Sequence, residues 1–473
     1  MAEAVAVEIL ESCMVTPSEA TPKHALWLSN LDLAFRSHTP MIFLYRRRSR
    51  PGCGSAAAFS PEILKAALSK ALVPYYPLAG RLAPRRAGRR PEINCTGGGE
   101  LFVTARADAT LDDMGHPAPS DELRRMFVPS GSEHAGILTM IQPAAINFGL
   151  SCIDRSQVTL FKCGGVCLGT AVHHMATDGR AFSSFLHTWA AIVRGVGEAP
   201  VPACLDRTLL RARSPPVARF DHIEYSCRPA PRAGGVPVSA QPNKTAFQTA
   251  ILPVSRNQVN TLKHAIAAGN NKMKLSTTTF TAVVAHVWRC ACMASPRRLN
   301  ADTRLYVTAD ARSRVRPPLP SNYLGNVILR SSAVSKVEDI VSNPLGVTAD
   351  RVAGAISMVN DEYVRSLVDF MEGASISGAE GMRSQGWFNP ETDLVVVSYL
   401  GVAFYSTVDF GWGRPTFVGR ASSIANGYIH LVPSDNQISL VVAMEPGRLS
   451  RFKQLFYEGL EHPTLEAKHY SKL

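Results

Sequence analysis

The 473-residue chain lacks the features that place a protein in a membrane or on a nucleic acid. Its longest apolar run, Leu394–Val408, contains Ser and Gly and is too short to span a bilayer. Dense Lys/Arg tracts with interleaved aromatic residues are absent, and the tightest basic cluster, Arg46–Arg50, precedes a Pro-Gly turn. We therefore expect no membrane and no nucleic-acid partner, although the formal net charge of +12 favours an anionic ligand.

Paired C-x-x-C spacing is also missing among the ten cysteines. Cys163 and Cys167 stand four apart, and Cys290 and Cys292 two apart, without the further His or Cys pair that a zinc site needs. The sequence has no Rossmann G-x-G-x-x-G and no P-loop, and its first residues lack the apolar core of a signal peptide. We expect no metal site and reduced thiols in an intracellular enzyme.

What the chain does have is an alternation of strand and helix patterns, which predicts an α/β protein. A helix is expected over Phe59–Leu72, with Ser60 as N-cap, and two strands over Gln157–Val172, joined by a Gly-Gly turn. Gly179 opens a second amphipathic helix. Further along, the sequence predicts a helix over Ser276–Cys290 capped by Ser276, and two strands or one bent strand over Asp393–Phe410.

The length predicts two domains rather than one core. The stretch from residue 200 to 243 is rich in Pro and Gly and is the best candidate for a linker. We accordingly expect one domain over residues 1–199 and a second over residues 244–473.

Two short stretches carry candidate chemistry. The first is HHMATDG, in which His174, but not His173, stands four residues before an aspartate, Asp178, at the junction of a strand and a helix. Reactive groups are often placed at such junctions, yet this spacing alone is a weak signal. The second is DFGWG, residues 409–413, in which two glycines flank Trp412 in a tight loop after an apolar segment.

Together these two stretches are specific. With LWLSNLDL, VTLFKCGG, DRTLLRARSPP and ADARSRVRPPLPSNYLGNV, they make the sequence resemble the plant BAHD acyl-CoA-dependent acyltransferases, in particular the hydroxycinnamoyl-CoA branch. The resemblance covers nearly the whole chain. It implies two chloramphenicol-acetyltransferase-like α/β domains with a central substrate channel, acyl-CoA as co-substrate without metal or permanently bound cofactor, and a monomer.

The same resemblance implies roles for individual residues. His174 matches the family's general base, and Trp412 matches the Trp that in the family lies beside the reaction centre and can donate to the oxyanion. Asp178 and Asp409 are expected to be structural, and Asp178 to pair with an arginine, for which Arg312 or Arg314 is the candidate. Chemistry supports the base, because a neutral imidazole can deprotonate an acceptor at neutral pH and a thioester needs no covalent intermediate.

Coenzyme A carries phosphates, and the segment before the helix at 276 resembles the phosphate-contacting region of the family. Lys272, Lys274 and Ser276 are therefore expected to bind CoA, since two lysines and free helix amides form an anion site.

The acceptor is expected to be an amine. Shikimate-using relatives carry an arginine shortly before DFGWG, whereas Gly401 stands at the matching position and no Lys or Arg occurs between Thr392 and Asp409. An acidic acceptor would lack its charged partner. A polyamine or tryptamine is the better match, with Glu372 or Asp369 as a cation partner, and O-acylation of shikimate, quinate or another alcohol is the alternative.

Two other mechanisms stay open at this stage. A cysteine nucleophile, Cys163 or Cys167, would form an acyl-enzyme, and a descendant without activity would bind CoA without turnover.

The tripeptide Ser471, Lys472 and Leu473 is a peroxisomal import signal at a free end, which predicts an import receptor as partner and a peroxisomal enzyme, with the cytoplasm as alternative. Peroxisomal location would favour benzoyl-CoA as a donor beside hydroxycinnamoyl-CoA.

Overall fold

The chain is described from a computed structural model. It describes residues 5–46, 60–83, 90–115, 117–129, 154–196, 202–225, 246–268, 277–295, 299–376, 388–422, 424–434 and 437–461. They form two compact units, each assembled from several stretches of the chain. Unit 1 contains Met1–Arg211, Leu319–Val327 and Gly401–Ser423, and unit 2 contains Ala212–Pro318, Ile328–Leu400 and Ile424–Leu473.

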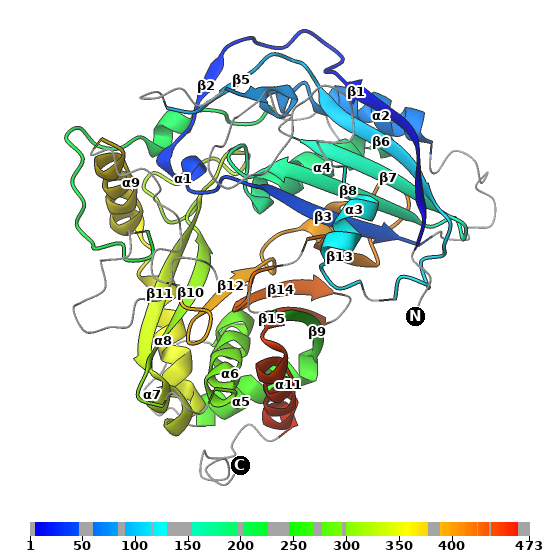
Figure 1. Cartoon of the computed structure of the whole chain (residues 1–473). Helices are drawn as coiled ribbons and strands as arrows, with labels where there is room; N and C mark the ends of the chain where they lie inside the picture. The colour runs from blue at the N-terminus through cyan, green and yellow to red at the C-terminus, as the bar shows by residue number, and fades with distance from the viewer. Residues whose placement is uncertain are drawn as a thin grey trace. The chain divides into compact units, whose positions relative to one another are not determined.

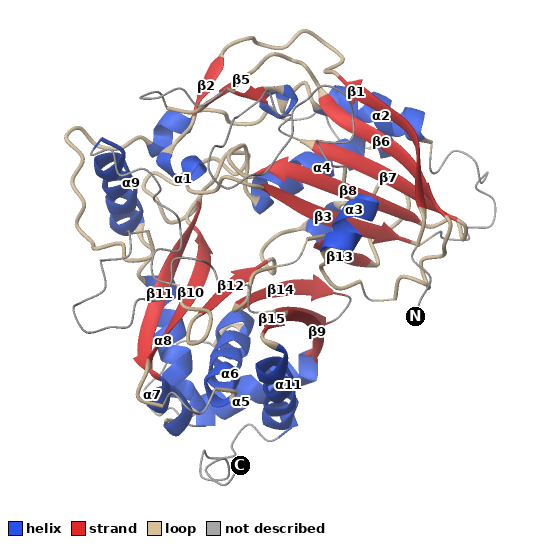
Figure 2. Cartoon of the chain, in the orientation of Figure 1, coloured by secondary structure: helices blue, strands red, loops and turns tan. Residues whose placement is uncertain are grey.

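Unit 1 is built on a six-stranded sheet (Figures 1 and 2). Its strand order is β1 (Val7–Val15), β6 (Glu100–Ala107), β7 (Arg155–Phe161), β8 (Val166–His173), β3 (His38–Tyr45) and β13 (Phe417–Arg420). Among the described strands of this sheet, β6 and β7 pair in parallel and the other neighbours pair antiparallel. A smaller sheet joins β2 (Ala25–Trp27), β5 (Glu92–Asn94) and β4 (Arg81–Leu82).

Helices cover both faces of this sheet. On one face α3 (Asp121–Phe127) packs on the alternate residues of β3 and β8 that include Ile42 and Ala171. On the other face α2 (Pro61–Ala71) packs against α4 (Gly179–Arg194), whose Trp189 meets Phe102 of β6 edge to face. The short elements of unit 1 are α1 (Asn30–Leu33), α10 (Phe404–Thr407) and the 3₁₀ turns η1 (Tyr76–Ala79) and η2 (Arg207–Leu210).

The division between the units differs from the predicted boundaries at 199 and 243. The DFGWG stretch, which the sequence assigned to a C-terminal domain, belongs to unit 1. The reason is the pairing of β13 with β3, in which Phe417 lies opposite Leu44. Leu319–Val327 joins unit 1 in the same way, through a bridge between Tyr323 and Cys204.

Unit 2 contains the second six-stranded sheet. Its order is β11 (Ile328–Lys336), β10 (Asp302–Asp310), β12 (Leu394–Ser398), β14 (Tyr428–Ser434), β15 (Gln437–Met444) and β9 (Gln248–Ser255). The main core lies between this sheet and its helices, which are α5 (Arg256–Ala268), α6 (Thr279–Met293), α7 (Val337–Ser342), α8 (Leu345–Ser357) and α11 (Pro446–Glu461). A further helix, α9 (Asp361–Ile376), holds the segment 213–222 through Ser366 and Asp369.

Several predicted elements are confirmed. The Ser60 hydroxyl accepts from the Ile63 N–H and caps α2, the two strands over 157–172 are β7 and β8, and α4 begins at Gly179. Two predictions are wrong. The cap of α6 is Thr278 rather than Ser276, and the apolar run after Asp393 forms only β12 before the chain turns into α10.

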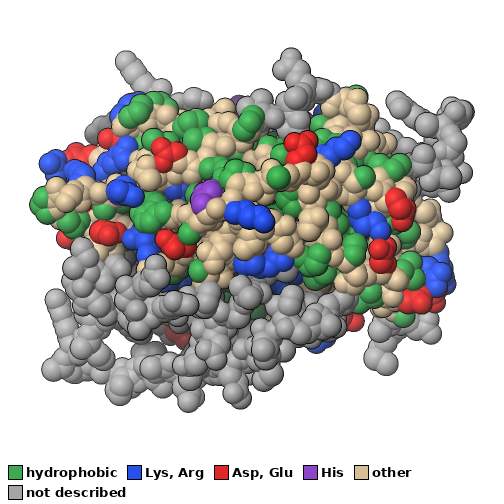
Figure 3. Space-filling view, turned by 90° about the horizontal axis from the view of Figure 1, so that it is seen from above, with side chains coloured by type: hydrophobic (Ala, Val, Ile, Leu, Met, Phe, Trp, Pro, Cys, Tyr) green, Lys and Arg blue, Asp and Glu red, His purple; other side chains and the backbone are tan. Residues whose placement is uncertain are grey.

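No helix in the described residues is long and apolar enough to cross a membrane. On the face shown in Figure 3, Lys and Arg side chains lie interspersed with Asp and Glu side chains. This face therefore carries basic and acidic side chains side by side rather than basic side chains alone.

Candidate active site

Strand β8 places the two adjacent histidines in different surroundings. His173 is its last residue and is buried, with its ring edge to face on His38 at 4.9 Å. Its Nδ1 accepts a hydrogen bond from the Met175 N–H, and burial lowers its pKa to about 4. His173 thus stays neutral and is engaged in packing, whereas His174 begins the turn that leads to α4.

The imidazole of His174 is fixed by two neighbours. It is partly buried and stacks on Phe35, with the ring centroids 4.5 Å apart. Its Nδ1 lies 2.9 Å from Oδ1 of Asn326, while the amide Nδ2 of Asn326 donates to the backbone carbonyl of His174 and to Asp32. Because the amide nitrogen already faces two acceptors, its oxygen must face Nδ1, which therefore carries the proton.

This tautomer leaves Nε2 of His174 with its lone pair. Burial lowers the pKa of His174 below its usual 6.5, and the nearby carboxylate of Asp178 and the bond to Asn326 act in the opposite direction. The imidazole is accordingly neutral at pH 7 and able to accept a proton at Nε2.

Asp178 is buried and spends both carboxylate oxygens on backbone N–H groups. Oδ1 caps α4 by accepting from Ala181, and Oδ2 accepts from Val327. The carboxylate thereby joins the start of α4 to the segment Leu319–Val327 within unit 1. Arg312, the predicted partner, lies in unit 2, where it binds Asp310; its pairing with Asp178 stays a prediction.

Asp409 closes the DFGWG loop. Its Oδ1 accepts from the N–H groups of Gly411 and Gly413, which both have positive φ, 94° and 91°. The indole of Trp412 is buried, with its ring edge to face on Tyr45 at 5.1 Å and tilted against Phe410. The loop thus buries the indole in aromatic packing, and its role toward an oxyanion stays a prediction.

The residues predicted to bind CoA and the acceptor fall in different parts of the chain. Lys272, Lys274 and Ser276 lie outside the described residues. Gly401 is exposed in unit 1, where a Cβ would meet no atom within 4 Å, and Glu372 lies on α9 in unit 2.

Asp369 is not the open cation partner that the sequence suggested as an alternative to Glu372. It is buried, and its carboxylate accepts from Nε of Arg213 at 2.6 Å and from the N–H groups of Arg213 and Val217. All of these partners belong to unit 2.

The cysteine alternative finds little support in the geometry. Cys167 is fully buried in β8, and burial raises the pKa of its thiol far above the ordinary value, so it does not form a thiolate. The exposed Cys163 accepts from the Leu111 N–H. In the part of the chain that the structure describes, no three His, Cys, Asp or Glu side chains cluster as metal ligands would.

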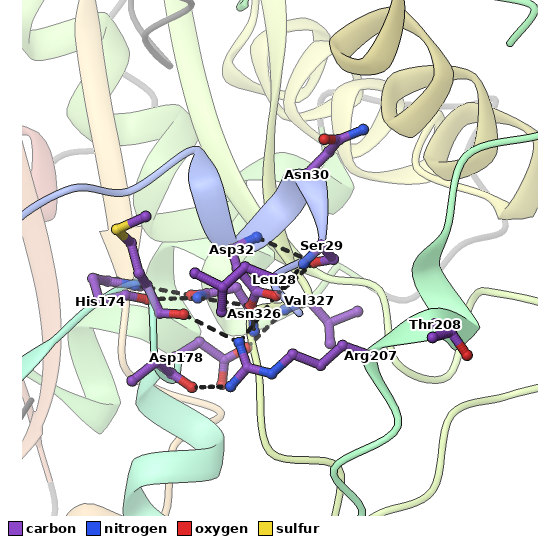
Figure 4. A network of polar contacts seen from close by, with 12 residues as sticks. Leu28, Ser29, Asn30, Asp32, His174, Asp178, Arg207, Thr208, Asn326 and Val327 are labelled. Carbon is purple, nitrogen blue, oxygen red and sulfur yellow. Dashed lines mark hydrogen bonds and ion pairs between the residues drawn. The ribbon is translucent and has the colours of Figure 1, made fainter. Parts of the chain in front are cut away.

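Sequence reasoning missed three residues of this site, which Figure 4 shows together: Asp32, Arg207 and Asn326. Asp32 Oδ1 accepts from the backbone N–H and the amide of Asn326, at 2.8 and 3.3 Å. Its Oδ2 lies 3.0 Å from Arg207 Nη1, and both side chains are buried. The stretches that contain them, LSNLDL, DRTLL and NYLGNV, carried the resemblance but gave no sign that the three meet.

Comparison with known proteins adds evolutionary evidence. The sequence profile of the Transferase family matches residues 5–459. The chain is 54% identical to putrescine hydroxycinnamoyltransferase 1 of Oryza sativa subsp. japonica, over 97% of this chain and 100% of that protein. It is 36% identical to anthranilate N-benzoyltransferase protein 1 of Dianthus caryophyllus, over 96% and 100%.

Two further similarities concern an alcohol-acylating relative and the fold. The chain is 35% identical to shikimate O-hydroxycinnamoyltransferase of Nicotiana tabacum, over 96% of this chain and 99% of that protein. Its structure is similar to that of vinorine synthase, with a TM-score of 0.67, 19% identity and coverage of 94% and 96%. The predicted α/β class with two such domains is confirmed by this likeness of fold.

Proposed function

Because the chain belongs to the BAHD acyltransferases of the Transferase family, in the hydroxycinnamoyltransferase-like branch, and is therefore an acyl-CoA-dependent acyltransferase, we propose that His174 is its general base and that its acceptor is a small amine. The observation that carries the base is the bond from Nδ1 of His174 to Asn326, which leaves Nε2 free of a proton.

The reaction proceeds without a covalent enzyme intermediate. Nε2 of His174 takes the proton of the acceptor N–H as its nitrogen attacks the thioester carbonyl carbon. When the tetrahedral intermediate collapses, the C–S bond breaks, and the imidazolium returns the proton to the sulfur of CoA. Thiolate is a fair leaving group, with a thiol pKa of about 8.5, so a base and an oxyanion donor suffice. Trp412 or an amide of its loop is proposed as that donor.

Two observations support the amine. The similarity to a putrescine hydroxycinnamoyltransferase extends over 97% of the chain, and Gly401 provides no positive charge for a carboxylate. The second candidate is O-acylation of shikimate, which is favoured by the 35% identity to a shikimate transferase. Lys272, Lys274 and Ser276 are proposed to hold the phosphates of CoA.

The test is a matrix of the purified protein with coumaroyl-, feruloyl- and benzoyl-CoA against putrescine, spermidine, agmatine, tryptamine and shikimate. We expect an amine to give the highest kcat/KM with one of these donors. His174→Gln should lower kcat by about 100- to 10,000-fold, the range of general base catalysis. Preferred esterification of shikimate would replace the amine proposal, and full activity of His174→Gln would refute the base.

We also propose peroxisomal import through Ser471, Lys472 and Leu473. A fluorescent protein fused to the N-terminus leaves Leu473 as the last residue and should collect in peroxisomes. The same fusion with two residues added after Leu473 should stay diffuse, because the import signal acts only at the free end. A diffuse distribution of the first fusion would refute the proposal, and the monomer stays a prediction.

A further inference from the structure

The buried pair of Asp32 and Arg207 contacts Asn326 on one side and the turn that follows His174 on the other, and these two segments supply the partners of the hydrogen bond that sets the tautomer of His174. On one side, Asp32 Oδ1 holds Asn326 through its backbone N–H and its amide Nδ2. On the other side, Arg207 donates to the carbonyls of Met175, at 3.2 Å, and Ala176, at 2.6 Å. These carbonyls belong to the turn that begins with His174. Figure 4 shows Asp32 and Arg207 together with Ser29, His174 and Asn326.

The pair itself is held on a third side by α1. Asp32 Oδ2 accepts from the N–H and the hydroxyl of Ser29, at 2.7 and 2.8 Å, in the capping box of this short helix. Its carboxylate therefore has four N–H or O–H donors besides the guanidinium. With all of these donors in place, the Asp32 carboxylate is held in one position and one orientation. A carboxylate that is fixed in this way can in turn fix the side chain of Asn326.

The charge of the pair is also unusual for a merely structural contact. The side chains of Arg207 and Asp32 are 1% and 0% exposed. A buried ion pair adds little stability over an apolar pair of similar volume, because desolvation offsets the attraction. Its benefit lies in direction: the planar fork of an arginine can bind a carboxylate and two carbonyls at fixed angles, which a lysine cannot do.

We propose that Asp32 and Arg207 are positioning residues of the reaction: the ion pair locks the Asn326 amide and the His174 turn in one mutual geometry, and so keeps Nδ1 of His174 protonated and Nε2 basic. The inference rests on the proposed role of His174 as base. Asp32 acts through Asn326, and Arg207 through the backbone of the turn.

The direct readout is the tautomer of His174, which ¹⁵N chemical shifts of labelled histidine report, with His174→Gln to identify the signals. The wild type should show the Nδ1–H form. In Asp32→Asn, the extra amide N–H groups meet donors, so the Asn326 amide is no longer fixed. We expect a mixture of both tautomers, a kcat lower by about 10- to 100-fold and a KM for acyl-CoA changed less than about twofold.

Asp369→Asn is the matched control, because it makes the same change in a buried carboxylate that binds Arg213 and two backbone N–H groups in unit 2. It should keep the wild-type tautomer of His174. Arg207→Lys retains the charge but not the fork, and should resemble Asp32→Asn. A wild-type tautomer and kcat in a folded Asp32→Asn protein would overturn the proposal.

A single variant that leaves one buried charge unpaired can fail to fold. The double variant Asp32→Leu with Arg207→Met removes both charges at similar volume, which is often neutral for stability. It should fold and still show mixed tautomers; a pure Nδ1–H signal would refute the inference. The proposed function fails separately, if His174→Gln keeps full activity, because the tautomer measurement does not depend on turnover.

Discussion

His174 is poised by two opposing influences on one ring. Burial lowers the pKa of the imidazole, and the carboxylate of Asp178 raises it again. The partner of Nδ1 of His174 is Asn326 rather than the acid of a triad, while the oxygens of Asp178 accept from the N–H groups of Ala181 and Val327. Its effect on His174 is therefore through charge, and its direct contacts are structural.

The pH dependence of kcat/KM should reflect this balance. Only the neutral imidazole acts as a base, so activity falls as the pH drops through the pKa of His174, and the midpoint should lie below 6.5. Asp178→Asn removes the negative charge that favours imidazolium, and should move the midpoint further down. Profiles between pH 5 and 8 test this, with the exposed Asp121→Asn as control; a midpoint that stays in place in Asp178→Asn contradicts it.

Gly401 allows a second residue-scale prediction. It is exposed and has open space around its missing Cβ, so a long side chain is tolerated. Gly401→Arg would offer a guanidinium to a carboxylate, and a charge-assisted bond is worth about 1.5–3 kcal/mol. The ratio of kcat/KM for shikimate over putrescine should rise about 10- to 100-fold.

The control for this change is Gly401→Met, which adds length without charge. It should leave the ratio within about threefold of the wild type. An equal ratio in both variants would mean that Gly401 does not face the carboxylate of an acceptor, and would remove one of the two observations that support an amine.

At this scale the sequence reached some residues and not others. The spacing to Asp178 and the family resemblance selected His174 over His173, a choice that stays a prediction. In the structure the two rings have different partners, Asn326 for His174 and the Met175 N–H for His173. The contact of Asn326 with His174 spans 152 positions, and its contact with Asp32 spans 294. A single sequence has no periodicity over such distances, so it could not indicate which polar side chains contact His174 and Asn326.

Among the helices and strands, local signals predicted elements well and their ends less well. Ser60 followed by Pro61 identified the start of α2, because serine favours the N-cap and proline favours the first helical position after it. The run Ser276-Thr277-Thr278 offers three possible caps to α6, and the chain uses the last. The apolar run after β12 looks like a strand by composition, but Phe404 is buried against Phe43 from the helical turn α10 instead.

The DFGWG loop gives a prediction at this scale. Gly413 has a φ of 91°, which an alanine adopts only with strain, and its N–H bonds to Asp409. Gly413→Ala should lower the free energy of unfolding by about 1–3 kcal/mol. Because Trp412 packs on Tyr45, kcat should fall as well. Urea unfolding and steady-state kinetics measure the two effects.

Gly354→Ala is the matched control for this substitution. Gly354 lies inside α8, and a Cβ there would meet no atom within 4 Å. The same change of side chain should stabilise the protein by about 0.5–1 kcal/mol, because alanine favours a helix interior. Equal effects of the two substitutions would contradict the strain assigned to the loop.

For the whole molecule, the sequence predicted two units but not which residues belong to each. Compositional breaks such as the stretch from 200 to 243 are local, whereas membership of a sheet is decided by pairing. Phe417 joins unit 1 because it lies opposite Leu44, and Leu319–Val327 because Tyr323 bridges to Cys204. Both unit 1 segments come from the half of the sequence assigned to the other domain.

The stability of the protein should depend on pH through buried groups whose effects have opposite pH dependences. Burial lowers the pKa of His173, His222 and His286 to about 4, because the folded protein disfavours their charged form. Their contribution to the free energy of unfolding is therefore fully present above about pH 6.5 and is lost as the pH falls toward 4. Burial raises the pKa of Asp154 to about 7, so its contribution is present below the ordinary value of 3.8 and is lost as the pH rises through 7.

Asp154→Asn tests the second effect, and it also removes the charge that helps to raise the pKa of the buried Glu100. Asp154 is fully buried before β7, where Oδ1 accepts from the Arg155 N–H, and an amide there is neutral at every pH. The native state of the wild type binds a proton between pH 5 and 7 that the unfolded chain does not, and the variant has no such proton. The stability of the variant relative to the wild type should therefore improve by about 1 kcal/mol per pH unit as the pH rises over this range. Urea unfolding at pH 5, 6 and 7 measures this difference in stability.

The control is Asp302→Asn, which changes an exposed carboxylate paired with Lys336 and should show the same stability difference from the wild type at each pH. A difference that stays constant for Asp154→Asn would mean that the Asp154 carboxyl is ionised throughout this range.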